Sequence, residues 1–247
     1  MKHKSINYKL IVNGLILSTI LYINNLSANA IISSKFQLNP YIGIGSGKQY
    51  LKFNNGYGDN LFQNELSTAT VFVGIKFNDY FGIEAGYKTT NEGTKTVTIY
   101  QGEKYLGVHD FGLNFGENSK YFTESKLRGW NLGLIGEYPF NFGGARNYLS
   151  ILGYVGIQNT NITLVSHMLT FGSLLTNTVD ALNNDNKKTL LKLSGGLQYF
   201  AFDNLSFRAM GSLENTCRLR AQNHRHTFKA ALKNSINYSL DLVFRYT

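Results

Sequence analysis

Alternation with a period of two in eight separate stretches constrains the fold of this chain more than any other feature. The stretches cover residues 41–48, 68–77, 81–88, 127–138, 148–158, 190–200, 205–214 and 235–246. In the second, Val71, Val73 and Ile75 alternate with Gly74 and Lys76. Because successive side chains of a β-strand point to opposite faces, a period of two indicates strands with one apolar face. The sequence therefore predicts an all-β protein.

Two β architectures produce such alternation, and they differ in where the apolar face points. A soluble sandwich or a lipocalin-like barrel buries that face in a core, whereas an outer-membrane barrel turns it toward lipid. Here the polar faces carry glycine, small residues and isolated charges of both signs, which suits a narrow lumen. The connections are short after the second, fourth and sixth stretches and long after the others. This is the up-and-down pattern of an outer-membrane barrel, which we therefore expect.

Aromatic residues near the ends of the stretches favour the same architecture, because outer-membrane barrels carry aromatic girdles at both membrane interfaces. The expected girdle residues are Tyr41, Phe77, Phe81, Trp130, Tyr138, Tyr199 and Tyr246. Charged residues make up only 16% of the chain, below the roughly 25% of an ordinary soluble domain. The single cysteine excludes an intramolecular disulfide and a thiolate zinc site.

The first 30 residues are expected to be a cleavable signal peptide. Lys2, Lys4 and Lys9 precede a mostly apolar segment, and Ala28 and Ala30 provide the small residues that a signal peptidase reads. Removal of the three lysines would lower the net charge from +9 to +6. Residues 31–247 then form a single exported domain, and beyond residue 30 the sequence has no apolar run long enough for a helical membrane span.

The predicted fold is an eight-stranded antiparallel up-and-down transmembrane β-barrel. Backbone groups in lipid must all be paired, so the first strand is expected to pair with the last. The alternating pieces 96–100 and 105–109 are expected to form a hairpin above the membrane, and a barrel of ten strands would result if that hairpin crossed the bilayer. The apolar piece 162–175 either folds over the barrel mouth or forms a short helix.

Residues 74–87, which include the short turn Asn78-Asp79-Tyr80, resemble the second and third strands of small OmpA-like outer-membrane β-barrels. Residues 40–45 are similar to the first strand of such proteins, and residues 205–209 to the seventh. The resemblance implies a Gram-negative outer-membrane location and insertion by the outer-membrane assembly machinery. In relatives this machinery recognises an aromatic C-terminal strand such as the one with Phe244 and Tyr246, although Thr247 stands where most relatives end on Phe or Trp.

Seven charged residues are expected to point into the lumen. An eight-stranded barrel is just wide enough for side chains to fill it, and buried charges need partners. We interpret the set as an ion-pair network in a plugged barrel. The bulky lumen residues Phe72, Ile135, Leu152 and Tyr154 also favour a plugged barrel. The alternative is a gated channel for small solutes. The network residues are Lys76, Glu84, Glu137, Lys192, Arg208, Asp241 and Arg245.

A surface basic patch occupies the last long connection and consists of Arg218, Arg220, His224, Arg225, His226 and Lys229. Its expected partners are lipopolysaccharide phosphates or host-surface polyanions, which bind a charge cluster in a salt-dependent way. A solvated loop without a partner is the alternative. Nucleic acid is not expected, because the chain is exported and the patch has no stacking aromatics nearby.

Catalytic chemistry is not expected, and neither is a cofactor or a metal. The sequence has no Gly-x-Ser-x-Gly elbow, and adjacent residues such as His109 and Asp110 point to opposite faces of a strand. The remaining outer histidines are His167, His224 and His226. The predicted function is a structural or surface-interaction role carried by long extracellular loops. A small passive porin is the alternative, and an outer-membrane hydrolase or acyltransferase is less favoured.

Overall fold

The structure is a computed structural model that describes residues 38–53, 62–99, 119–140, 148–169, 184–215, 217–222, 227–233 and 235–246. Within these ranges the backbone alone is described for residues 99, 119–121, 166–169, 184–186, 218–222 and 227–231. The predicted signal peptide lies outside the described residues and stays a prediction.

The described residues form strands joined by turns. The strands are β1 (Asn39–Tyr50), β2 (Glu65–Lys76), β3 (Phe81–Thr90), β4 (Gly93–Ile99), β5 (Ser119–Phe140), β6 (Leu149–Leu169), β7 (Asn184–Phe202), β8 (Leu205–Glu214), β9 (Cys217–Gln222), β10 (Thr227–Leu232) and β11 (Ser235–Arg245). In the described part of the chain there is no helix that is long and apolar enough to span a membrane.

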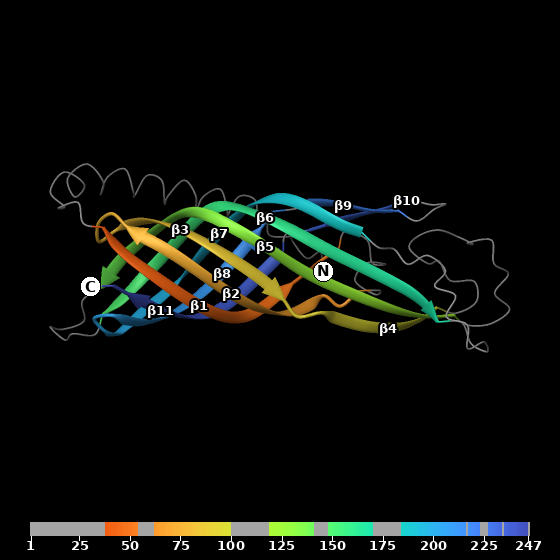
Figure 1. Cartoon of the computed structure of the whole chain (residues 1–247), viewed down its shortest axis with the longest axis horizontal. Helices are drawn as coiled ribbons and strands as arrows, with labels where there is room; N and C mark the ends of the chain where they lie inside the picture. Colours follow the sequence, from red (N-terminus) through yellow and green to blue (C-terminus); the bar gives the residue numbers. More distant parts are fainter. Residues whose placement is uncertain are drawn as a thin grey trace, which may run out of the picture. The chain divides into compact units, whose positions relative to one another are not determined.

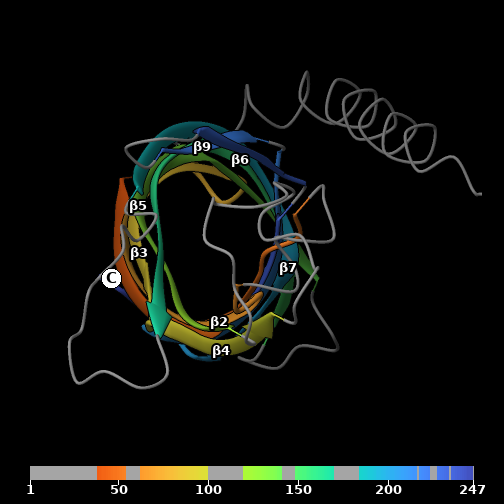
Figure 2. The same ribbon diagram turned by 90° about the vertical axis from the view of Figure 1, so that its right-hand side faces the viewer.

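Eight of these strands close into an antiparallel barrel in the order β3-β2-β1-β11-β8-β7-β6-β5, and β5 returns to β3. Figure 2 shows the closed ring along its axis. The predicted pairing of the first strand with the last is confirmed, since ten residues of β1 pair with β11 from Tyr41↔Arg245 to Tyr50↔Ile236. β3 pairs directly with β5, so among the described strands the barrel has eight members rather than ten.

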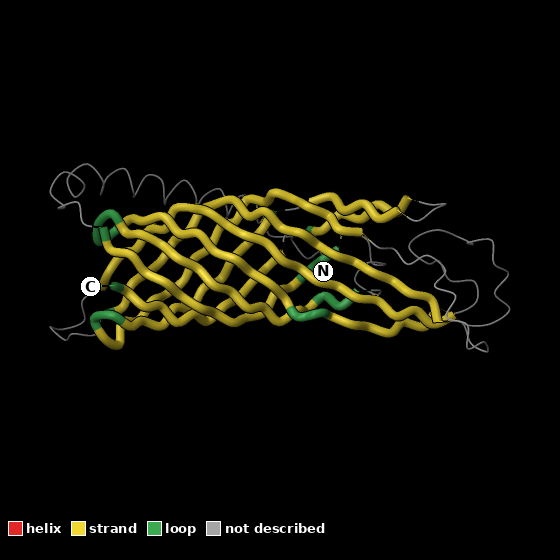
Figure 3. Tube along the Cα trace, in the orientation of Figure 1, coloured by secondary structure: helices red, strands yellow, loops and turns green. Residues whose placement is uncertain are grey.

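The short connections lie together at one end of the barrel, the turn end (Figures 1 and 3). Residues 77–80 join β2 to β3, and residues 203–204 join β7 to β8. The first turn is held by Asn78, whose Oδ1 accepts hydrogen bonds from the backbone N–H groups of Tyr80 (2.9 Å) and Phe81 (2.8 Å). This side-chain mimicry of a backbone turn is typical of Asn.

The opposite end, the loop end, extends much further than the sequence predicted. β5, β6 and β7 have 22, 21 and 19 residues, about twice the length that a tilted strand needs to cross a bilayer. β4 pairs with Ser119–Ser125 of β5. The second arm of the expected hairpin, 105–109, lies outside the described residues, so that hairpin stays a prediction. Residues 162–169 of the apolar piece are neither a lid nor a helix but continue β6.

β9 and β10 form a two-stranded hairpin that follows β8 and precedes β11. Cys217 pairs with Leu232 at its base, and Leu232 also forms an isolated bridge with Phe53. Figure 1 shows the hairpin at the loop end, beyond the barrel ring. The last long connection therefore contains regular structure.

Side-chain burial follows the inverted pattern of a membrane barrel. Large apolar side chains lie outside, such as Leu240 (72% exposed) and Ile44 (56%), while Arg208 and Lys88 are buried. On β5 the outward Trp130 and Tyr138 are separated by eight residues, which is about 20 Å of membrane depth for a strand with a tilt of about 40°. Tyr41 is a correction: its ring is buried in the lumen and does not belong to the girdle.

Candidate functional site in the barrel interior

The interior contains three polar clusters stacked between the turn end and the loop end. The turn-side cluster contains Lys76, Glu137 and Arg245, and the central cluster contains Tyr41, Glu84 and Arg208. The loop-side cluster contains Gln49, Lys88, Glu214, Ser235 and Asn237. An apolar layer, the apolar plug, lies above them and is described below.

Glu137 joins two cations in the turn-side cluster. It pairs with Lys76, and its Oε2 accepts a hydrogen bond of 2.9 Å from Nη2 of Arg245. Ser150 donates to its other oxygen at 2.8 Å, and the Arg245 guanidinium lies 4.0 Å from the centre of the Phe200 ring. Both carboxylate oxygens of Glu137 therefore have donors, which holds the side chain in a fixed position.

Glu84 is the centre of the central cluster. Its Oε2 accepts hydrogen bonds from Nη1 of Arg208 at 2.6 Å and from the Tyr41 hydroxyl at 3.0 Å. The Arg208 guanidinium also lies 4.8 Å from the centre of the Phe72 ring. β3 and β8, which carry the two charges, are four steps apart in either direction round the ring, so this pair crosses the full width of the lumen.

The loop-side cluster holds a second pair between β3 and β8, Lys88 with Glu214. Lys88 also donates to Oε1 of Gln49 at 2.7 Å, and Ser235 donates to Glu214 at 3.3 Å. Lys88 and Glu214 are not among the residues that the sequence predicts for the network. Alternation places both residues on polar faces, which is the signal that could have found them. They lie at the ends of stretches 81–88 and 205–214, and alternation within one stretch does not show that the two residues meet inside the barrel.

Lys192 and Asp241 are the two predicted network residues without a direct ionic partner. Among the described side chains Lys192 has no carboxylate within 4 Å, and its Nζ lies 5.2 Å from the centre of the Tyr154 ring. Asp241 is paired in register with Arg208, but its Oδ1 is buried without a hydrogen-bond partner. Both residues line a polar cavity of about 30 Å³, which has room for about two water molecules.

The apolar plug fills the barrel at the loop end. Its members are Leu51, Phe53, Phe62, Leu66, Leu127, Ile162, Leu164, Leu190, Cys217 and Leu232. They come from the ends of the barrel strands, from the described parts of the β1–β2 connection and from the base of the β9–β10 hairpin. Burial raises the pKa of the Cys217 thiol, because the thiolate would lose its hydration there.

All seven residues predicted to face the lumen do point inward, and five of them enter direct ion pairs. With Lys88 and Glu214 added, the interior holds five bases and four acids. Buried pairs of this kind gain Coulomb energy only where the remaining donors and acceptors are also satisfied. The Ser, Tyr and Gln contacts described above provide that satisfaction.

The surface basic patch is only partly described. The backbones of Arg218 and Arg220 lie in β9 and that of Lys229 in β10, where Lys229 pairs with Arg220. These three residues share the face of the hairpin opposite Cys217, which faces the apolar plug. His224, Arg225 and His226 lie outside the described residues.

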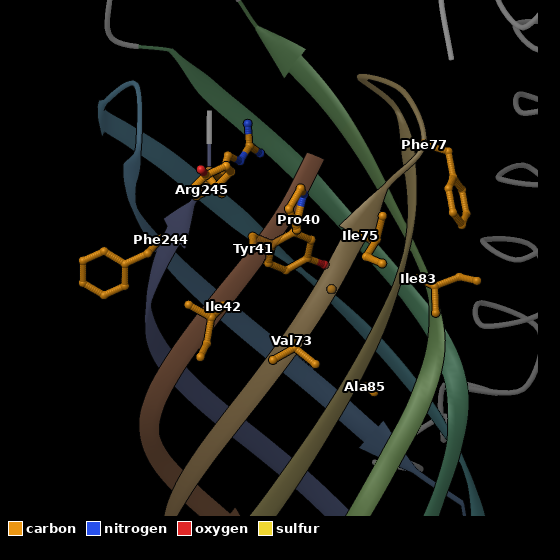
Figure 4. Close-up of a pocket in the computed structure, with 12 residues that line it drawn as sticks. Pro40, Tyr41, Ile42, Val73, Ile75, Phe77, Ile83, Ala85, Phe244 and Arg245 are labelled. Atoms are coloured by element: carbon orange, nitrogen blue, oxygen red, sulfur yellow. The ribbon is translucent and has the colours of Figure 1, made fainter. Parts of the chain in front are cut away.

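The outer wall carries a shallow apolar hollow of about 640 Å³ near the turn end. Figure 4 shows Ile42, Val73, Ile83 and Phe244 along it, from β1, β2, β3 and β11. Its lining is almost entirely apolar, and it lies within the lipid-facing belt. This hollow therefore suits contact with acyl chains.

His109 and Asp110 lie outside the described residues, and His167 is described only as backbone of β6. In the described ranges no three His, Cys, Asp or Glu side chains lie close enough together to hold a metal ion.

The topology and burial define the class of protein. An antiparallel ring of eight described strands, apolar outside and ion-paired inside, is the fold of a small outer-membrane β-barrel protein. The fold agrees with the resemblance to OmpA-like barrels in the sequence, and the protein is an outer-membrane barrel. No protein-family model and no curated protein matches the chain.

Several solved outer-membrane proteins are similar to the chain in structure. OprG from Pseudomonas aeruginosa has 8% identity and a TM-score of 0.46, over 86% of this chain and 97% of OprG. The attachment invasion locus protein Ail of Yersinia pestis, in complex with the heparin analogue sucrose octasulfate, has 12% identity and a TM-score of 0.45, over 85% of this chain and 99% of Ail. Neisserial surface protein A has 10% identity and a TM-score of 0.44, over 84% of this chain and 97% of that protein. Identities of this size carry no information on ligand or activity.

Proposed function

We propose that this protein is a non-enzymatic barrel with a sealed lumen that presents its loop end as a surface for interaction. The observation that carries the proposal is the pair of barriers in series inside the barrel. The apolar plug lies at the loop end, and the three ion-paired clusters lie below it. A solute would have to disrupt both.

The polar clusters oppose conduction because their bridges span the lumen. Glu84–Arg208 and Lys88–Glu214 both join β3 to β8, and Glu137–Arg245 joins β5 to β11, which are also four steps apart in the ring. Opening a path would leave buried charges without partners, which costs about 3–5 kcal/mol for each broken pair. The small-solute porin remains the second candidate, because the cavity beside Lys192 is polar.

Conductance in planar bilayers separates the two candidates. Pure refolded protein is expected to give no stable single-channel steps in about 1 M KCl, a salt concentration at which surface charges are screened. Stable steps whose size scales with salt concentration would favour the porin instead. Heat-modifiable migration on a gel provides the control that the inserted protein is folded.

The interaction surface that we propose is the surface basic patch on the β9–β10 hairpin. Arg218, Arg220 and Lys229 share the hairpin face opposite the apolar plug, and clustered cations attract lipopolysaccharide phosphates or host polyanions. The triple substitution Arg218→Gln, Arg220→Gln and Arg225→Gln is expected to weaken attachment of cells to an anionic surface at low salt. Unchanged attachment would contradict this role while leaving the sealed barrel intact.

A further inference from the structure

A row of three polar residues crosses the outer face of β5, β6 and β7 at the edge of the apolar belt. Arg128 of β5 pairs in register with Asn161 of β6, which pairs in turn with Lys187 of β7. The next outward residue of β5 toward the membrane is Trp130, which is half exposed. Neighbouring strands lie about 4.8 Å apart, so the backbones of Arg128 and Lys187 are about 10 Å apart. Both long side chains can reach a group that lies over Asn161.

The two cations of this row have no ionic partner among the described side chains. Neither Arg128 nor Lys187 has a carboxylate within 4 Å among the described side chains, whereas Lys48, on the outer face of β1, pairs with Glu65 at 2.9 Å. Asn161 lies between the two cations, and its Nδ2 group can donate to an anion; its Oδ1, an acceptor that is buried without a donor, has no part in anion binding. Within the described part of the chain, the positive charges of Arg128 and Lys187 are therefore not balanced by an ion pair.

The acidic residues of this part of the wall do not lie between the row and the membrane. Glu92 is 3.9 Å from Lys126, a different cation. Glu124 is four residues from Arg128 along β5, or about 13 Å. Asp185 is two residues, or about 7 Å, from Lys187 along β7, on the side away from the membrane, so it does not lie between the row and the lipid. The edge of the row that meets the membrane is cationic.

We propose that Arg128, Asn161 and Lys187 form a binding site for a phosphate group of an outer-leaflet lipid. The planar guanidinium of Arg128 can donate two parallel hydrogen bonds to phosphate, and Lys187 adds a second positive charge. Trp130, one row nearer the apolar belt, lies where interfacial tryptophans anchor proteins at the level of lipid headgroups. The site shares no residue with the surface basic patch, so it can fail or hold independently of the proposed function.

The chain supplies its own reporter for this site. Trp130 is the only tryptophan in the sequence and lies two residues from Arg128 on the same face. Refolded protein in zwitterionic micelles is titrated with diphosphorylated lipid A while Trp130 emission is recorded, and bound lipid is counted by native mass spectrometry. We expect saturable binding. Arg128→Gln and Lys187→Gln should each weaken it about fivefold, and the double substitution about twenty-five-fold.

Matched controls separate this site from general charge effects. Lys48→Gln removes a cation that already has a partner and should leave the affinity unchanged. Lys187→Arg should retain most of the binding, whereas Arg128→Lys, which keeps the charge but loses the two parallel hydrogen bonds, should retain only part of it. Heat-modifiable migration checks that each variant is folded.

Two results would overturn the proposal. One is equal lipid A affinity of the folded double variant and the unchanged protein. The other is complete competition by inorganic phosphate at millimolar concentration, because the site would then recognise a soluble anion rather than a lipid. Dephosphorylated lipid A, in contrast, is expected to give no saturable change, which supports the phosphate as the recognised group.

Discussion

Arg208 and Glu84 form an ion pair of 2.6 Å across the barrel although they are 124 positions apart in the sequence. β8 and β3 carry them on opposite walls, and the Tyr41 hydroxyl donates to the same carboxylate oxygen. This contact, with the parallel pair Lys88–Glu214, connects the two halves of the ring through the lumen.

Removing one member of the central pair is expected to destabilise the barrel strongly. Glu84→Leu leaves the Arg208 guanidinium buried without a carboxylate partner, which costs about 3–5 kcal/mol. The double substitution Glu84→Leu with Arg208→Met removes both charges and should cost clearly less than the sum of the two single changes. Urea-induced unfolding in lipid vesicles measures each value. Additive costs would show that the two residues do not interact.

Tyr41→Phe tests the correction that places this ring in the lumen. The variant loses the hydrogen bond to Glu84 and should lower the free energy of unfolding by about 1 kcal/mol. Tyr138→Phe is the matched control, because Tyr138 points outward at the turn end and its loss of a hydroxyl should change stability little. Equal effects of the two substitutions would contradict an inward Tyr41.

Glycine on the lumen face makes room for aromatic packing at Gly43. A Cβ atom at this position would overlap the ring of Phe72, whereas a Cβ at Gly153 would meet nothing within 4 Å. Gly43→Ala is therefore expected to cost about 1–3 kcal/mol through overpacking, and Gly153→Ala should be nearly neutral. The same urea titration gives both numbers, and a harmless Gly43→Ala would contradict the packing described here.

The apolar plug should contribute to stability without being the only barrier. Phe62 is buried there, and Phe62→Ala should cost about 3–5 kcal/mol. The exposed Phe202, at the turn end, provides a control whose truncation leaves no cavity. Because the ion-paired clusters remain, the folded Phe62→Ala protein should still show no conductance. Channel steps in this variant would mean that the plug alone closes the lumen.

Cys217 provides a pH-dependent probe of the same plug. Burial raises the pKa of its thiol, so the reactive thiolate appears only at a higher pH than for an exposed cysteine. Alkylation of the folded protein by iodoacetamide should therefore be slow at neutral pH and accelerate at a pH above that of a model thiol. The urea-unfolded chain should react at the ordinary rate and pH. Equal profiles for the two states would show an exposed Cys217.

Local alternation accounts for what could be predicted. It placed all eight strands, and it placed Lys76, Glu84 and Arg208 on the inner face, because the direction of a side chain on a strand depends only on its position in a period of two. The same period of two explains why the predicted interface position of Tyr41 was wrong. An aromatic residue at the end of a stretch suggests a girdle, but the alternation of β1 turns this one inward.

The extended loop end could not be predicted from alternation. β5, β6 and β7 continue beyond the belt with polar outward residues such as Lys126 and Thr163, so the apolar face that identified the strands in the membrane is missing there. What stabilises these extensions is the pairing of one strand with the next and the apolar plug inside them. Neither is visible in the residues of a single strand.

The amino-acid sequence by itself determined that the chain forms an eight-stranded barrel, which face of each strand meets lipid, and seven of the nine charges that enter the lumen. Only the tertiary structure decided the partners, placing Glu84 opposite Arg208, Lys88 opposite Glu214, and Arg128 in one row with Asn161 and Lys187. The physical reason is that the face to which a side chain points depends only on the local backbone. Which two side chains meet depends on closure of the ring and on the register of every intervening strand.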